Sequence, residues 1–76
     1  MEISLLKKGD YGTQVERVQQ LLSANGFACG VDGLFGDETS AALRAFQTAA
    51  GAEADGEWGA ESFAAMRDFE RREGEP

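Results

Sequence analysis

The sequence predicts an all-α fold, a compact three-helix domain with a pseudo-repeat of an Asp-Gly-x-aromatic-Gly turn followed by a helix. The first observation is the repeat itself, because residues 32–47 return in related form at residues 55–70. The second is that apolar residues recur at helical spacing after each turn. The third is the length, since 76 residues make one domain with a small core. The two copies share the identical pairs Asp32/Asp55, Gly33/Gly56, Gly36/Gly59, Glu38/Glu61, Ala41/Ala64, Ala42/Ala65, Arg44/Arg67 and Phe46/Phe69.

The first third of the chain is predicted to be an extended lead-in and a helix. A weaker copy of the turn, at residues 9–12, precedes a helix expected over about residues 13–25. Asn25-Gly26 is a helix stop, with Gly26 in the left-handed conformation that glycine adopts without a Cβ clash. Phe27 follows and is predicted to be core. The residues expected to pack inward are Ile3, Leu5 and Leu6 from the lead-in and Val15, Val18, Leu21 and Leu22 from the helix.

Two further helices are predicted over about residues 37–50 and 60–71, and Gly51 ends the first of them. Their inward residues are expected to be Thr39, Ala42, Leu43 and Phe46, and Phe63, Met66 and Phe69. Small alanines at positions 41, 42, 64 and 65 are expected to let these helices approach closely. Residues 71–76 are charged and end in proline, which predicts a tail or linker after a domain of residues 1–70.

Each turn carries residues with a structural use. The carboxylates of Asp32 and Asp55 can accept backbone N–H groups further along the turn, while the glycine that follows tolerates positive φ. An aromatic residue before a helix can pack against a residue inside its first turns, and Phe63 is placed to do this for Trp58. These carboxylates therefore have a structural role available before any functional one.

Composition excludes several classes of function. The net charge is -7, from 7 Lys and Arg against 14 Asp and Glu, which opposes binding to nucleic acid and to an anionic membrane. The chain has no His and one Cys, so an internal disulfide and the usual zinc sites are not expected. The twelve-residue EF-hand spacing is absent too. We therefore expect no metal and no cofactor, and a monomer. Residues 1–8 lack the pattern of a signal peptide, which predicts synthesis in the cytoplasm.

No set of reactive groups points to an enzyme. Cys29 has no histidine to activate it, and Asp32 and Asp55 are better explained as turn residues than as a pair for glycoside hydrolysis. The candidate binding residues are the aromatics at the turn–helix junctions. Tyr11 and Trp58 fit either helix packing or ligand contact, because each has a polar tip, whereas Phe35 favours packing. Gln19, Gln20 and Gln47 can contact amides or face solvent, and Arg44 and Arg67 favour surface ion pairs.

These residues carry a resemblance to a known family. Four stretches carry it, in this order: Leu6-Lys7-Lys8-Gly9-Asp10-Tyr11-Gly12 with Val15, Val18, Gln19 and Leu22; Gly26-Phe27; Val31-Asp32-Gly33-Leu34-Phe35-Gly36 with Thr39, Ala42, Leu43, Phe46 and Gln47; and Ala54-Asp55-Gly56 with Gly59. Together they resemble the type 1 peptidoglycan-binding domain family. The match spans roughly residues 5–69, in the order and spacing of the family. Asp37, Ala60 and Ala28-Cys29 stand where relatives often have a proline or a proline-containing step.

The resemblance implies non-catalytic binding of bacterial cell-wall peptidoglycan. Our hypothesis for the part that is bound is the peptide stem, with or without its adjoining sugar. The resemblance also implies that the domain targets an attached or associated wall hydrolase, such as a phage endolysin, and acts at the cell wall. Matching positions for ligand contact are Tyr11, Asp32, Phe35, Thr39, Gln47 and Trp58. The alternative that the residues leave open is a small helical protein–protein interaction module built on the same scaffold.

Overall fold

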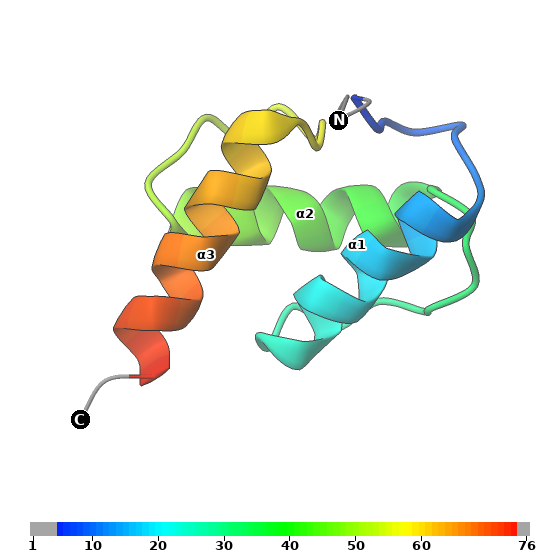
Figure 1. The fold of residues 1–76 in the computed structure, drawn as a ribbon. Coiled ribbons are helices and arrows are strands. Elements are labelled where there is room, and N and C mark those ends of the chain that lie inside the picture. Colours follow the sequence, from blue (N-terminus) through cyan, green and yellow to red (C-terminus); the bar gives the residue numbers. More distant parts are fainter. Residues whose placement is uncertain (1–4, 75–76) are drawn as a thin grey trace.

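The computed structural model describes residues 5–74 and contains three helices in that range. They are α1 (Thr13–Ala24), α2 (Asp37–Ala49) and α3 (Ala60–Gly74). In Figure 1, α2 spans the middle of the molecule, α1 crosses it near one end and α3 crosses it near the other. The all-α, three-helix fold class is therefore confirmed. The starts of all three helices are as predicted, and α1 and α2 end one residue before the predicted positions.

The lead-in segment, residues 5–12, ties the two Asp-Gly turns to the helices. Leu6 and Trp58 exchange both backbone hydrogen bonds at 2.8 Å, as in an antiparallel pair of strands. Further along, the Gly12 N–H donates to Gly33 at 2.9 Å and the Phe35 N–H donates to Asp10 at 2.9 Å. The segment thus contacts the chain just before α2 and just before α3. These pairings are isolated bridges and do not form a sheet in the described part of the chain.

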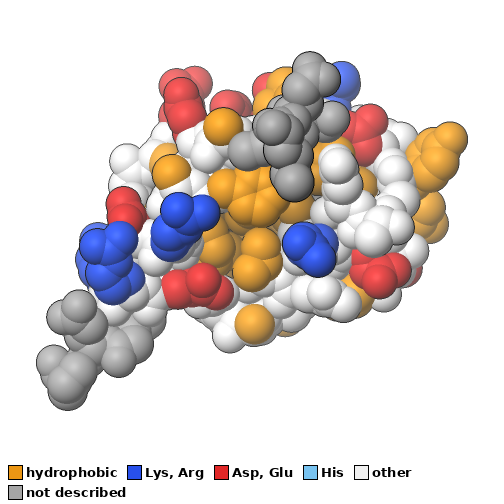
Figure 2. Space-filling view, in the orientation of Figure 1, with side chains coloured by type: hydrophobic (Ala, Val, Ile, Leu, Met, Phe, Trp, Pro, Cys, Tyr) orange, Lys and Arg blue, Asp and Glu red, His pale blue; other side chains and the backbone are white. Residues whose placement is uncertain are grey.

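One hydrophobic core lies among the three helices. The fully buried residues are Val15, Val18 and Leu22 of α1 and Leu43 and Phe46 of α2. Met66 of α3 is almost fully buried. Phe27, Phe63 and Phe69 are partly buried and pack against this core. Figure 2 shows hydrophobic side chains gathered in the middle of one face, with charged side chains around them. The predicted inward faces are confirmed for the helices and for Leu6 of the lead-in. Leu5 is half exposed, at 52 %, and Ile3 lies outside the described residues.

Two glycines end α1 and α2 in the same way. Gly26 has φ +93° and Gly51 has φ +78°. At the end of α1 the Phe27 N–H donates to Leu22 at 2.8 Å, and at the end of α2 the Ala52 N–H donates to Gln47 at 2.8 Å. With the accompanying bonds from Gly26 to Ser23 and from Gly51 to Thr48, these are complete Schellman motifs. The prediction that Gly26 is left-handed is confirmed.

Two expectations about the helices were wrong. α3 continues to Gly74, three residues beyond its predicted end at Arg71, so residues 71–74 are helical. The helix has no breaker before Gly74, and Arg71 and Arg72 in its last turn suit the negative end of the helix dipole. Ala41 and Ala64 are exposed and so do not bring α2 and α3 together, although Ala42 and Ala65 are buried or partly buried.

The glycines that precede α1 and α2 allow a matched test of the backbone. Gly36 has φ -112°, which any residue adopts, and a Cβ there would meet nothing within 4 Å. Gly12 has φ +120°. We expect Gly36→Ser to stabilise the protein by about 0.5 kcal/mol, because serine caps a helix and restricts the unfolded chain. Gly12→Ser should cost about 1 kcal/mol through the strained φ. Urea denaturation measures the free energy of unfolding of both variants. Equal effects would contradict the difference in backbone conformation between Gly12 and Gly36.

Candidate functional site

The first Asp-Gly turn is held by a buried glutamine of α1. Gln19 is fully buried, and its side-chain oxygen accepts the N–H groups of Asp32 at 3.0 Å and Gly33 at 2.9 Å. Its Nε2 donates to the Asp32 carboxylate at 3.0 Å, the Leu34 carbonyl at 3.0 Å and the Thr39 hydroxyl at 2.9 Å. The Leu34 N–H donates to Asp32 Oδ1 at 2.9 Å, which closes the turn. A single amide side chain therefore fixes the whole turn before α2.

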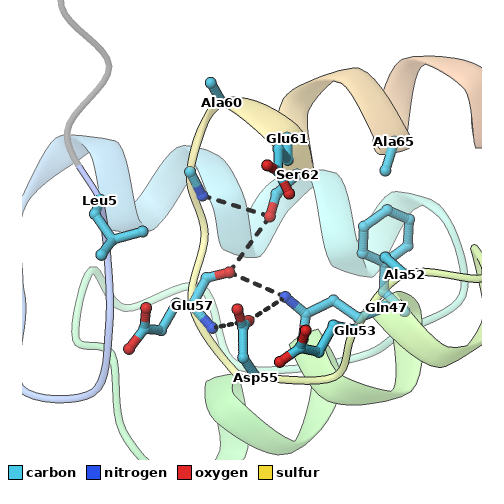
Figure 3. A pocket seen from close by; sticks show the side chains of 12 residues that line it. Leu5, Gln47, Ala52, Glu53, Asp55, Glu57, Ala60, Glu61, Ser62 and Ala65 are labelled. Atoms are coloured by element: carbon cyan, nitrogen blue, oxygen red, sulfur yellow. Dashed lines mark hydrogen bonds between the residues drawn. The ribbon is translucent and has the colours of Figure 1, made fainter.

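A second buried glutamine, Gln47 of α2, holds the other Asp-Gly turn (Figure 3). Its oxygen accepts the Gly56 N–H at 3.0 Å, and its Nε2 donates to Asp55 Oδ1 and to the Glu57 carbonyl, both at 2.9 Å. The Glu57 N–H donates to Asp55 Oδ1 at 3.0 Å. Ser62 Oγ donates to the Glu57 carbonyl at 3.3 Å. The prediction that both aspartates hold their turns is confirmed by these hydrogen bonds.

The hydrogen bonds to the two aspartates lower their pKa. For Asp32 the main cause is the Leu34 N–H, followed by the Gln19 side chain, and for Asp55 the main cause is the Glu57 N–H. A lowered folded-state pKa means that each carboxylate stabilises the fold above its unfolded pKa of about 3.9, and that this contribution is lost as the pH falls through the folded-state value. Both turns are therefore expected to weaken in acid.

A double variant tests this pH dependence. In Asp32→Asn/Asp55→Asn, the amide oxygens can still accept the turn N–H groups, but they do not titrate between pH 7 and pH 2. We expect the free energy of unfolding of the wild type to fall more steeply below about pH 4 than that of the double variant. Thermal unfolding followed by circular dichroism measures this. Parallel curves for the two proteins would show that the turn carboxylates do not carry the acid sensitivity.

The six residues predicted to contact ligand occupy very different environments. Tyr11 is 79 % exposed and Asp32 is exposed. The other four side chains are buried, and the exposed fractions are 2 % for Phe35, 2 % for Thr39, 4 % for Gln47 and 0 % for Trp58. Thr39 and Gln47 are also engaged in the hydrogen bonds of the turns. The structure brings Gln19, Asp32 and Thr39 together at the first turn, and it places Gln47 at the second.

Trp58 is a core residue and lies at the junction between the second turn and α3. Its ring packs at right angles to that of Phe63, with centroids 5.1 Å apart, and against Phe46 at 6.0 Å. The predicted packing of Trp58 on Phe63 is confirmed. The indole N–H has no hydrogen-bond partner among the described residues and is buried. The polar tip of Trp58 suggested contact with a ligand at the surface. Its burial shows that the indole N–H does not reach solvent.

An open groove runs beside the second turn and the start of α3 (Figure 3). Its volume is about 390 Å³. Leu5 of the lead-in stands on one side, and Ser62 and Ala65 of α3 stand on another. Four carboxylate side chains line it, those of Glu53, Asp55, Glu57 and Glu61. Gln47 is the one residue of the six predicted ligand contacts that lines this groove.

Sequence reasoning missed the structural importance of Gln19 and the groove carboxylates. Gln19 lies four residues after Val15 and three before Leu22, so it falls on the apolar face of α1. A polar residue on such a face must find partners when it is buried, and this was the available signal. Glu53 and Glu57 lie in a connection without periodicity, and nothing in their spacing places them with Glu61 around one groove.

No other group among the described residues is arranged for catalysis or metal binding. The Cys29 thiol is partly buried, and burial raises its pKa, which makes it a poor nucleophile. Within residues 5–74, no group of His, Cys, Asp and Glu is arranged to hold a metal ion. No helix of the described chain is long and apolar enough to cross a membrane. Arg44 lies beside Gly56 and Asp55 and contributes to the lowered pKa of Asp55.

The comparisons with known proteins give one consistent result. The family model for a peptidoglycan binding domain matches residues 11–66. A probable N-acetylmuramoyl-L-alanine amidase of Bacillus licheniformis is 46% identical over 55 residues, and the amidase CwlL of the same organism is 43% identical over 56. These matches cover 68% and 70% of this chain, but only 16% of the length of each amidase.

Solved structures agree in fold. The SleB N-terminal domain has a TM-score of 0.81 and 38% identity, covering 86% of this chain and 90% of that one. A peptidoglycan-binding protein from Clostridioides difficile, solved with glutamine hydroxamate, has a TM-score of 0.80 and 32% identity, covering 83% of this chain and 40% of that one. Since the family model matches well over half of the sequence, this chain belongs to the peptidoglycan binding domain family.

Proposed function

We propose that this chain binds bacterial cell-wall peptidoglycan without cleaving it, through the peptide stem with or without the adjoining sugar. The observation that carries the proposal is membership of the family over residues 11–66. The matched residues include both Asp-Gly turns, and the groove lies beside the second of them. A site of this kind is open to solvent and buries little of its ligand, so we expect weak, reversible binding.

We further propose that binding serves an attached or associated wall hydrolase at the bacterial cell wall, such as a phage endolysin. The curated relatives are amidases, and the region that matches this chain makes up only 16% of the length of each. A module that holds an enzyme against an insoluble polymer raises the local concentration of cleavable bonds, even when its own affinity is low. The chain contains no His, and its thiol has a raised pKa, which supports a binding role over a catalytic one.

Co-sedimentation with purified sacculi tests the proposal. The wild type should be retained by sacculi and released by soluble muropeptides, and it should not be retained by chitin or cellulose. Tyr11→Ala serves as one arm because its 79 % exposed side chain can be removed without opening the core. A weaker retention of this variant would place the sugar or stem near the first turn.

Trp58→Ala is unsuitable for this test because it opens the core. If the folded wild type is not retained by sacculi, the proposal fails. If the wild type binds an immobilised wall hydrolase but not sacculi, the result would favour a protein–protein interaction module.

A further inference from the structure

The groove beside the second turn combines an apolar surface with an acidic one. Leu5, Ala52 and Ala65 contribute apolar surface, and four acidic residues, Glu53, Asp55, Glu57 and Glu61, line the same groove. Among the described residues that line the groove, there is no Lys or Arg. Such a surface suits a ligand that carries an aliphatic chain and a positive charge.

The neutral polar groups of the groove are already used by the fold. Gln47 gives both amide protons to Asp55 and Glu57, and its oxygen accepts the Gly56 N–H. Ser62 Oγ accepts the Gly59 N–H at 3.4 Å and donates to Glu57. Within the described part of the chain, neither an ion pair nor a hydrogen bond engages the side-chain carboxylates of Glu53, Glu57 and Glu61. Charge is therefore the groove's main remaining means of recognition.

We propose that this groove binds the side-chain ammonium of a diamino acid in the peptide stem, with the aliphatic part of that side chain on the apolar surface. This inference rests on the proposed function, because it specifies which part of peptidoglycan the chain binds. An ammonium is a compact charge with three donors, which several carboxylates can share. A stem carboxylate would be repelled by the same groove, and a neutral sugar would gain nothing from its charge.

Glu61 and Glu16 provide a matched pair of variants. Each is an acidic residue in the first turn of its helix, Glu61 in α3 and Glu16 in α1, so each substitution by Gln removes one charge from a helix N-terminus. Only Glu61 lines the groove. We expect Glu61→Gln to weaken retention on sacculi about threefold at low salt, and Glu57→Gln/Glu61→Gln to weaken it about tenfold. Glu16→Gln should bind like the wild type.

The decisive comparison uses sacculi whose free amines have been acetylated, which removes their positive charge and keeps the glycan intact. We expect the wild type to bind acetylated sacculi about tenfold more weakly than untreated ones at low salt, and this difference to shrink at 0.5 M salt. The double variant should no longer distinguish the two preparations. Circular dichroism confirms that each variant is folded.

Equal binding of the wild type to both preparations, with the double variant unchanged, would overturn the inference and leave the proposed function standing. Absence of binding to either preparation would instead overturn the proposed function itself.

Discussion

Phe46→Ala is expected to cost about 4 kcal/mol of the free energy of unfolding. Phe46 is fully buried, and its ring lies 5.7 Å from that of Phe27, 5.7 Å from that of Phe69 and 6.0 Å from that of Trp58. These rings come from the segment after α1, from α3 and from the second turn. Removing the central ring therefore leaves a cavity where three parts of the chain meet. A domain of this size has a total stability of roughly 4–11 kcal/mol, so the loss takes up a large share of it.

Urea denaturation followed by fluorescence measures this effect, since Trp58 is the single tryptophan and touches the site. Phe46→Leu is the control, because it keeps most of the volume and should cost about 1–2 kcal/mol. A loss below 1 kcal/mol for Phe46→Ala would show that the aromatic cluster does not hold α2, α3 and the second turn together. The contact between the rings of Phe46 and Trp58 also means that each substitution is expected to change the environment of the other residue.

The helices could be predicted from the sequence because all three starts and two of the three ends carry local signals. Gly26 and Gly51 take the left-handed conformation at the ends of α1 and α2, and this requirement is visible in the sequence as a glycine after an apolar run. The starts at Thr13, Asp37 and Ala60 each follow a glycine. The end of α3 carries no such signal before Gly74, and there the prediction was three residues short.

The burial of side chains was harder to predict at the turns than in the helices. Phe35, Trp58 and Tyr11 occupy the same place in the pattern, yet two are buried and Tyr11 is 79 % exposed. The difference comes from the lead-in, which pairs with Trp58 through Leu6 and with Leu34 through Tyr11. Those pairings join positions far apart in the chain and depend on tertiary packing. The groove has the same origin, since Leu5 reaches it only because Leu6 pairs with Trp58.

Gln19→Leu is expected to cost about 3 kcal/mol, although it replaces a polar side chain in a hydrophobic surrounding with an apolar one of similar size. The change removes five hydrogen bonds, two from backbone N–H groups to Gln19 and three from its amide to Asp32, Leu34 and Thr39. The Gly33 N–H lies in a buried position, and a buried donor that loses its partner costs about 1–3 kcal/mol by itself. Gln20→Leu is the control, because Gln20 is exposed and its substitution should stay within about 0.5 kcal/mol.

Gln19→Glu distinguishes the accepting role of the Gln19 side-chain oxygen from the donating role of its Nε2. The new carboxylate can still accept the N–H groups of Asp32 and Gly33, but it meets the Asp32 carboxylate where Nε2 donates in the wild type, at 3.0 Å. Two carboxylates that share a site raise the pKa of one of them above its unfolded value of about 4. Such a group stabilises the fold below that value and loses its contribution as the pH rises through the folded-state pKa. We therefore expect the destabilisation of Gln19→Glu relative to the wild type to grow between pH 4 and pH 7, and that of Gln19→Leu to change much less. If chemical denaturation at the two pH values shows the same difference for both variants, Gln19 Nε2 does not hold Asp32 in the first turn.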